Sequence, residues 1–182
     1  EAENINTKAV KRGDTINYQV WLDTTKFDAN NKDNIQTVGI TDDYDEAKLE
    51  VKQSDIKAYD GKTGADVTDK FDISIANGVI TANLKPGFTK SLGDAENTQI
   101  IDTTKFEFGR YYKFVIPAKV SDGAYDGAEI ENTAAQVVNY YNPTTKKTEK
   151  PEKPTEKRVN NVPMAIQLIF GKTLNGRQLK DK

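Results

Sequence analysis

The stretch VGITDDYDE, residues 38–46, places a carboxylate where the sequence pattern calls for an apolar side chain. Val38 and Ile40 alternate with small or polar residues, as in a strand with one buried face. Continuing the period of two puts Asp42 on the buried side, while Asp43 points to solvent. A buried carboxylate is costly unless it has a partner or a chemical task. We therefore expect Asp42 either to do chemistry or to be the satisfied polar residue of a turn.

The missing residue types exclude most catalytic machinery. The 182 residues include no Cys and no His. Without Cys there is no disulfide framework and no thiolate metal site. Without His the usual general base is absent, so Ser-His-Asp and Cys-His systems are excluded. A polysaccharide hydrolase needs only two carboxyl groups, but no second inward carboxylate lies near Asp42 in the sequence, and we expect no enzyme.

The acidic residues around Asp42 raise one alternative, a cation site. Together with Asp42, the residues Asp43, Asp45 and Glu46 could offer oxygen ligands to Ca²⁺. The cluster lacks the spacing of an EF-hand loop, and charged residues at strand ends are usually just solvated. We expect no other cofactor, because no P-loop, dinucleotide-binding or HExxH motif occurs.

The chain around this stretch has the period-two pattern of β-strands. Turn signals such as Pro86-Gly87 separate the runs, and Asn77-Gly78 between DISIA and VITANL predicts a tight hairpin. Many short strands with frequent turns are typical of a two-sheet sandwich. The sequence thus predicts an all-β fold whose main inward-facing runs are Ile16, Tyr18, Val20 and Leu22; Phe71, Ile73 and Ile75; Tyr112, Phe114, Ile116, Ala118 and Val120; and Ile130, Ala134 and Val138.

Two segments depart from this pattern. Residues 141–157, YNPTTKKTEKPEKPTEK, are rich in Pro, Thr, Lys and Glu and predict a solvated loop or linker. Residues 164–182 turn apolar again, with Ile166, Leu168 and Phe170 alternating as in one strand. A single strand is not stable alone, so it docks on the sandwich or begins another domain. We expect one domain over residues 1–163 and take 164–182 as the truncated start of the next.

The overall composition limits the kinds of partner that we expect for this chain. The formal net charge is -2, which gives no reason to expect a nucleic-acid partner. No apolar run approaches the roughly 20 residues that span a bilayer, so we expect no membrane insertion. No signal peptide is present, and we expect the sequence to be a piece of a longer protein.

Two blocks, NINTKAVKRGDTINYQVWLD and VGITDDYDEAKLEV, resemble the C-terminal domains of the streptococcal antigen I/II adhesins. Those domains carry a similar Lys-x-Val…Gly-(Asp/Thr)…Tyr strand, followed by a Val-Asp-Asp-Tyr-like stretch. IENTAAQVVN and the closing VNNVP extend the likeness, which covers about Ile5 to Pro163. The resemblance implies an IgG-like two-sheet β-sandwich of the collagen-adhesin type.

The resemblance also implies an internal isopeptide bond between a first-strand lysine and a last-strand asparagine, assisted by an aspartate. An uncharged lysine amine attacks the asparagine carboxamide, and ammonia leaves. Burial lowers the pKa of a lysine and raises the pKa of a carboxylic acid, so a dry pocket favours both reacting forms. Holding the two side chains close together further accelerates the formation of the bond. Asp42 matches the role of the acid.

For the lysine of this bond we favour Lys8, which shares parity with Val10. Lys11 is the alternative, although it adjoins Arg12 and Gly13 and has the pattern of a solvent-facing residue. Some family members place the lysine ahead of the Ile-Asn-x-Lys stretch, in which case this chain would lack it. Taken alone, Lys8 would be read as a solvated lysine.

For the asparagine we favour Asn160, which alternates with Val162 and lies where the family has Ser-Asn-x-Val. Asn132 is an alternative because Ile130 and Ala134 place it inward, although it could simply bond a neighbouring backbone group. Asn161 is a further alternative of opposite parity.

The tail AIQLIFGKTLNGRQLKDK carries a second resemblance, to the opening strand of Gram-positive pilin-type isopeptide domains. The lysine of a Lys-x-Leu-x-Gly-Arg-x-Leu-like stretch forms the bond in those domains. Lys172 matches that lysine, and its partner would lie beyond residue 182.

Together these resemblances imply a structural stalk or adhesion module of an extracellular, cell-wall-anchored surface protein of a Gram-positive bacterium. An internal crosslink would stabilise it, and neighbouring domains of the same chain would contact it. The alternative is a receptor-binding adhesin domain whose loops contact a host or bacterial surface protein or glycoprotein.

Overall fold

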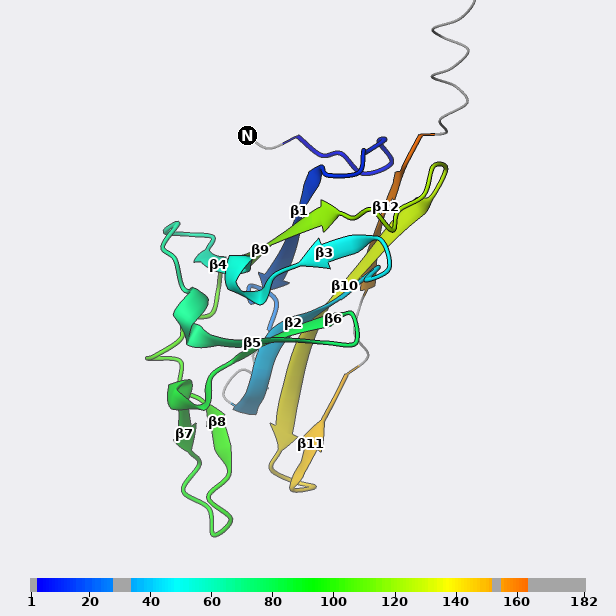
Figure 1. The fold of residues 1–182 in the computed structure, drawn as a ribbon. Coiled ribbons are helices and arrows are strands. Elements are labelled where there is room, and N and C mark those ends of the chain that lie inside the picture. The colour runs from blue at the N-terminus through cyan, green and yellow to red at the C-terminus, as the bar shows by residue number, and fades with distance from the viewer. Residues whose placement is uncertain (1–2, 28–33, 152–154, 164–182) are drawn as a thin grey trace, which may run out of the picture.

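Two antiparallel β-sheets pack face to face in the computed structural model, which describes residues 3–27, 34–151 and 155–163 (Figure 1). The predicted all-β sandwich is thus confirmed. Short 3-10 turns lie at Gln53–Asp55, Thr68–Lys70 and Pro86–Phe88. In this part of the chain no helix has the length and apolar character that crossing a membrane requires.

The first sheet is built around β9 (Tyr111–Val120). β1 (Thr15–Asp23) pairs with one side of β9 along its full length. β3 (Leu49–Val51) and β4 (Lys57–Asp60) share the other side of β9, one after the other. β1 is therefore an edge strand of this sheet.

The second sheet is built around β10 (Glu129–Asn142) and β2 (Ile35–Tyr44). β6 (Val79–Leu84) and β5 (Phe71–Ala76) extend it beyond β2. Two strands share the other side of β10. β12 (Thr155–Asn161) pairs with its first part, and β11 (Lys147–Glu149) pairs with its last residues. A separate pair, β7 (Thr89–Ser91) and β8 (Gln99–Ile101), projects at one end (Figure 1).

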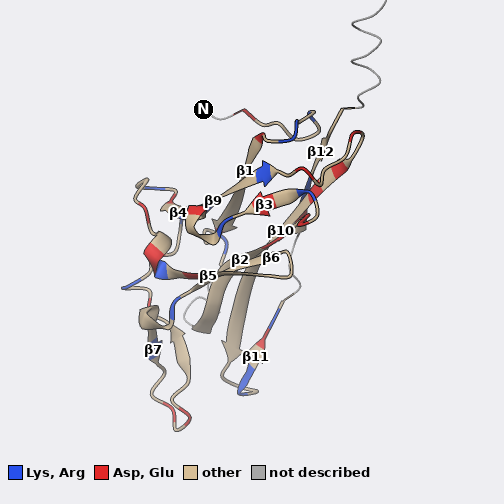
Figure 2. Ribbon diagram, viewed as in Figure 1, with Lys and Arg blue, Asp and Glu red and all other residues tan. Residues whose placement is uncertain are grey.

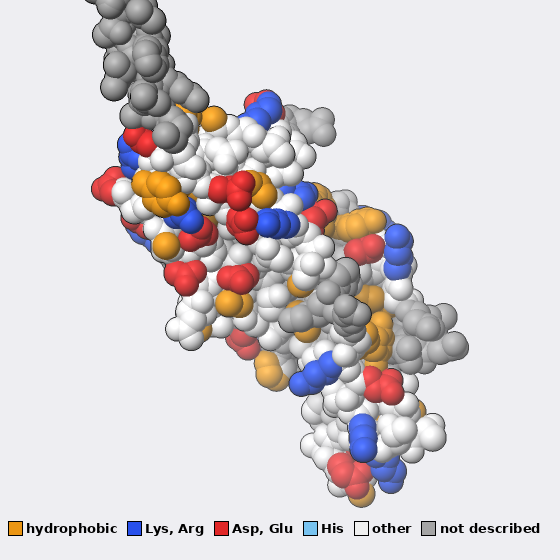
Figure 3. Space-filling model, turned by 90° about the vertical axis from the view of Figure 1, so that its right-hand side faces the viewer, with side chains coloured by type: hydrophobic (Ala, Val, Ile, Leu, Met, Phe, Trp, Pro, Cys, Tyr) orange, Lys and Arg blue, Asp and Glu red, His pale blue; other side chains and the backbone are white. Residues whose placement is uncertain are grey.

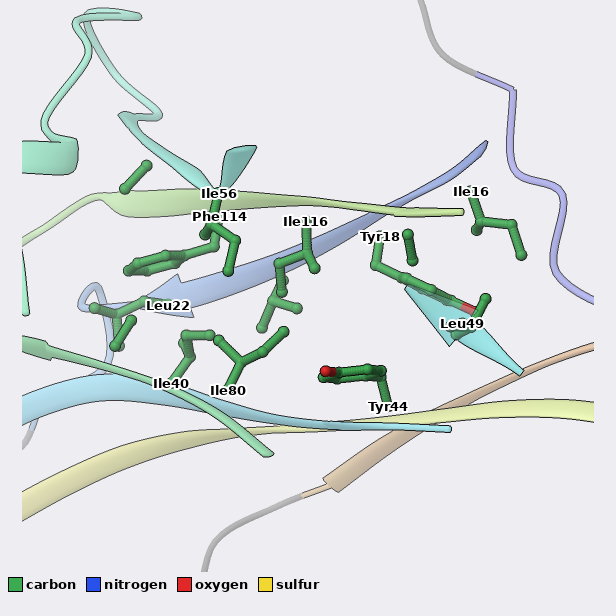
Figure 4. Packing of buried hydrophobic residues seen from close by; sticks show 14 of the residues in the cluster. Ile16, Tyr18, Leu22, Ile40, Tyr44, Leu49, Ile56, Ile80, Phe114 and Ile116 are labelled. Carbon is green, nitrogen blue, oxygen red and sulfur yellow. The ribbon is translucent and has the colours of Figure 1, made fainter. Parts of the chain in front are cut away.

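The core lies between the sheets and follows the period-two pattern. Leu22, Ile40, Ile80 and Phe114 are fully buried, and they approach from β1, β2, β6 and β9 (Figure 4). Phe71 meets Phe114 edge to face, with ring centroids 4.9 Å apart. Such aromatic pairs stabilise a core beyond their buried area, by about 1 kcal/mol each.

The predicted hairpin joins β5 to β6. Asn77 and Gly78 have φ values of 52° and 76°, the pair of positive angles that a type I′ turn requires. This turn matches the twist of the flanking strands and fixes the register of β6 against β5, and β6 in turn pairs with β2. β2 carries the residue of greatest chemical interest, Asp42.

Residues 141–157, predicted as a solvated loop or linker, contain paired strand residues in their described part. β10 continues to Asn142, a turn follows, and β11 pairs back onto it; β12 then begins at Thr155. Main-chain pairing with β10 stabilises these segments, although their side chains give no apolar pattern. Lys and Glu are common on such edge strands because they discourage further pairing.

The surface carries both charge signs. Lys, Arg, Asp and Glu are spread over the loops and strands of both sheets (Figure 2). On the face shown in Figure 3 acidic and basic side chains are interspersed. This distribution agrees with a formal net charge of -2 and offers no basic stripe for a nucleic acid on that face.

Candidate functional site

A buried carboxyl–carboxamide pair joins β2 to β10. Asn132 Nδ2 donates a hydrogen bond to Asp42 Oδ2 over 2.8 Å. Asp42 is 0% exposed and Asn132 is 3% exposed, so both side chains point inward as their parity predicts. The register of the two strands explains the contact, because Asp42 pairs with Ala134 and the next inward residue on β10 is Asn132.

Burial changes the acidity of Asp42. Loss of hydrating water raises the pKa of its carboxyl to about 6, from an ordinary value of 3.8. The hydrogen bond from Asn132 lowers this pKa, and the nearby charge of Asp43 raises it, but the effect of burial is the largest. Asp42 can therefore hold or release a proton close to neutral pH.

Three buried oxygen atoms near this pair lack a hydrogen-bond partner among the described residues. They are Asp42 Oδ1, Asn132 Oδ1 and the hydroxyl of Tyr18. Tyr18 reaches from β1 into the space between the sheets (Figure 4). Burial, followed by the charges of Asp42 and Asp45, raises the pKa of Tyr18, so its hydroxyl stays protonated. Unpaired buried polar atoms are costly and call for an explanation.

Asn160 lies on β12, and its side chain makes hydrogen bonds to backbone groups. Its buried side chain donates from Nδ2 to the carbonyl oxygens of Ile5 at 2.7 Å and Lys8 at 2.9 Å. Asn6 Oδ1 accepts a 2.8 Å hydrogen bond from the backbone of Val159. Asn160 thus fastens the first described segment of the chain to β12.

That segment also makes main-chain bonds with β12. The N–H of Thr7 donates to Val159 over 2.7 Å, and that of Val10 donates to Asn161 over 2.8 Å. Ala9 and Asn161 form a parallel bridge. The first and last segments of the described domain therefore run side by side in the same direction.

Neither candidate lysine meets the buried pair. The Lys8 side chain is 52% exposed, and its Nζ forms an ion pair with Glu3. Lys11 is exposed, and its backbone N–H donates to Asp14 over 2.9 Å. Within the described residues, no hydrogen bond joins either amine to Asp42, Asn132 or Asn160. The predicted Lys8–Asn160 crosslink stays a prediction.

The structure leaves the remaining candidate residues outside the buried pair or outside its described ranges. Asn161 is exposed, and Lys172 lies outside the described residues, as does the proposed next domain at 164–182. Asp43 is exposed, while the carboxylate of Asp45 forms an ion pair with Lys48 at 2.8 Å. No group of three or more His, Cys, Asp or Glu in the described ranges is arranged to hold a metal ion.

A groove of about 540 Å³ lies beside the buried pair. Its lining residues come from β1, β10, β12 and the segment Glu3–Asn6. Tyr18, Asn132 and Asn160 all line it. Sequence reasoning missed the groove, although the pattern of β1 did place Tyr18 inward.

Comparison with known sequences gives one clear family match. The profile of the cell surface antigen I/II C2 terminal domain matches residues 1–162. Aggregation substance of Enterococcus faecalis is 27% identical, over a region that covers 75% of this chain and 11% of that protein. The chain therefore spans only a small part of that relative.

Solved structures from several bacteria share the fold. BcpA, the major pilin subunit of Bacillus cereus, has a TM-score of 0.59 at 18% identity, covering 86% of this chain and 37% of that chain. The C-terminal domain of the AgI/II polypeptide BspA of Streptococcus agalactiae gives 0.53 at 15%, covering 88% and 46%. The Actinomyces fimbrial adhesin FimA gives 0.51 at 18%, covering 82% and 51%. At these identities the likeness concerns the fold alone.

Proposed function

The chain belongs to the cell surface antigen I/II C2 terminal domain family, and on this premise we propose that it is a stalk or adhesion module of a Gram-positive, cell-wall-anchored surface protein. The family match over residues 1–162 is the observation that carries this proposal. The family and the similar folds are those of adhesins and pilins rather than of enzymes. The module serves by its shape and durability, and it converts no substrate.

An internal isopeptide bond is the second part of the proposal. The pair of Asp42 and Asn132 supports it, because it supplies the acid and the carboxamide in one dry place. A lysine Nζ attacks Asn132 Cγ, a C–N bond forms, and the original C–N bond breaks to release ammonia. Asp42 lies beside the nitrogen that leaves and can pass its proton to it, then regain one from the attacking amine.

The choice of asparagine follows from the contacts. Asn132 bonds the acid, whereas both donor positions of Asn160 are engaged by backbone carbonyls. Asn132 is therefore the better acceptor, and Asn160 is the alternative. Lys8 can serve as the amine only if its side chain leaves Glu3 and turns into the groove; a lysine from outside the described residues is the other source.

Intact mass spectrometry tests the crosslink. We expect the purified domain to be lighter than its sequence by one ammonia, and Asp42→Asn and Asn132→Ala to restore the full mass. Asn161→Ala, an exposed neighbour, is the matched control and should keep the lighter mass. A full-mass domain that yields a free Lys8 peptide on digestion would show that no bond forms within this chain, and the adhesion-module role would stand without it.

A receptor-binding role is the second candidate, favoured by an exposed aromatic pair. Trp21 and Tyr111 are 48% and 43% exposed, and their rings meet edge to face at 6.0 Å. Lys113 lies over the Trp21 ring at 5.9 Å. Exposed aromatic residues often anchor protein interfaces. The proposed partner is a host or bacterial surface protein or glycoprotein.

Adhesion assays with surface variants test this role. Trp21→Ala combined with Tyr111→Ala should reduce binding to cells at least about tenfold if the pair is an anchor, since such anchors contribute 2 kcal/mol or more. Folding should be little changed because both side chains face solvent. Tyr125→Ala, at another exposed aromatic residue, is the control. Unaltered adhesion by the double variant would remove the support for this role.

A further inference from the structure

The outer edge of β5 is free for main-chain pairing. β5 is the last strand of the second sheet, and it pairs with β6 on one side only (Figure 1). The N–H of Lys85 donates to the carbonyl oxygen of Lys70 over 2.9 Å, so the even-numbered residues from 70 to 76 are those that bond β6. Ile73 and Ile75 therefore direct their N–H and C=O groups outward. Within the described residues, no hydrogen bond engages these outward groups.

This edge lacks the features that usually prevent further strand pairing. The register of β5 with β6 runs without a bulge from Phe71 to Ala76. The strand contains no Pro and no Lys, and Asp72 is its only charged residue. Natural edge strands are commonly protected by Lys, Pro or a bulge. β11, an edge strand on the far side of the same sheet, does carry such charges, at Lys147 and Glu149.

Apolar surface lies beside the free edge of β5. The side chains of Ile73 and Ile75 pack against the core but are only partly buried. An open hollow of about 670 Å³ borders the strand, and Ile56, Phe71 and Ile73 form part of its lining. A strand added to β5 would place its alternate side chains next to those of Ile73 and Ile75, on the same face of the sheet. The edge therefore offers apolar contact as well as main-chain bonds.

The two ends of β5 carry opposite charges. Lys70, which lies over the Phe88 ring at 5.5 Å, precedes the strand, and Lys85 lies beside it. At the other end, the exposed Glu46 places its carboxylate over Gly78, in the turn that follows β5. Glu46, Lys70 and Lys85 form no ion pair within the described part of the chain. An antiparallel copy of the same edge would bring each basic end against an acidic end.

We propose that β5 is a self-association edge: two copies of this chain pair their β5 strands antiparallel, about a two-fold axis, and join their second sheets into one. The outward groups meet when Ile73 lies opposite Ile75 of the second copy, and each such pair exchanges both of its N–H···O bonds. The Ser74 side chains of the two copies then lie opposite each other, and Asp72 faces Ala76. No like charges are opposed at this register.

The same register accounts for the charges. The turn after β5 of one copy lies opposite the start of β5 in the other, so Glu46 of each copy lies near Lys70 of its neighbour. The occupant of this edge is therefore a second copy of the chain, whose edge matches in shape and in charge. This inference goes beyond the proposed function, because self-association through β5 needs neither the crosslink nor a receptor.

Sedimentation velocity of the whole chain tests the pairing. We expect a monomer–dimer equilibrium that depends on protein concentration. Ser74→Lys places two ammonium groups opposite each other at the two-fold axis and should leave the chain monomeric, because like charges on directly opposed residues oppose strand pairing. Gln19→Lys, at an exposed residue of β1, is the matched control and should dimerise like the unchanged chain.

A charge exchange tests the register. Glu46→Lys and Lys70→Glu should each weaken dimerisation about tenfold, because like charges replace both ion pairs of the dimer and 1.4 kcal/mol corresponds to a factor of ten. An equal mixture of the two variants should regain dimerisation, since every contact then joins opposite charges again. A chain that stays monomeric at millimolar concentration, a dimer that Ser74→Lys leaves unchanged, or a mixture that associates no better than either variant would overturn the proposal.

Discussion

At the residue scale, the ionisation of Asp42 opposes folding. Its carboxyl is buried, and its pKa rises to about 6 in the folded chain against an ordinary 3.8. The folded state therefore binds the proton more tightly than the unfolded state. By linkage, stability is greatest where both states are protonated and falls as pH rises from about 4 to about 6.

Comparison of Asp42→Asn with the unchanged chain tests this sign. Asparagine keeps the shape and cannot ionise, so the variant should gain stability relative to the original as pH rises through the window. The relative gain should approach about 3 kcal/mol, because each pKa unit corresponds to 1.36 kcal/mol. Denaturant titrations at pH 4 and pH 7 measure it. A relative stability that stays flat, or moves the other way, would contradict a buried, reluctantly charged Asp42.

The period-two pattern of the sequence correctly predicted that some of these side chains point inward, and it failed for others. Asp42 and Asn132 lie in long regular strands, where alternation holds, and both point inward. Lys8 does not point inward, because residues 6–7 form a turn and the segment after it makes only an isolated bridge with β12, at Ala9. The period of two holds in a regular strand, so the parity of Val10 does not extend back to Lys8.

At the element scale, strands with an apolar period-two pattern were easier to anticipate than polar strands. The Asn77-Gly78 turn and the apolar runs defined β5, β6, β9 and β10 from local rules. β11 and the start of β12 were missed because their residues, from Lys147 and Thr155 onward, carry no apolar signal. Their pairing with β10 is a tertiary effect that composition does not record.

Gly39 shows how closely β2 and β6 approach. A Cβ at this position would collide with the carbonyl oxygen of Ala82 and lie 2.5 Å from the Asn83 side chain. Gly39→Ala should therefore destabilise the fold by about 2 kcal/mol, the usual cost of overpacking, and loosen the strand that carries Asp42. Gly87→Ala is the control, because nothing lies within 4 Å of its added Cβ. Thermal unfolding of both variants measures this loss of stability. Equal melting temperatures would show that β2 can shift to accommodate the added methyl group.

At the scale of the whole molecule, Asn160 connects the two ends of the described domain. Asn160→Ala removes two hydrogen bonds to backbone carbonyls and leaves a buried gap, so we expect a loss of about 2–3 kcal/mol. Amide exchange at Thr7 and Val10 should accelerate more than exchange in β9. Asn161→Ala, exposed on the same strand, should cost less than about 0.5 kcal/mol. Similar losses for both variants would mean that the side chain of Asn160 is not what secures the first segment.

The parallel bridge between Ala9 and Asn161 has a mechanical consequence. If the two ends of the described domain are pulled apart along the strand direction, the two neighbouring segments are dragged past each other. The bonds from Thr7, Val10 and Asn160 then bear the load together in shear, whereas an antiparallel pair of ends would unzip one bond at a time. A tether built this way yields late and abruptly.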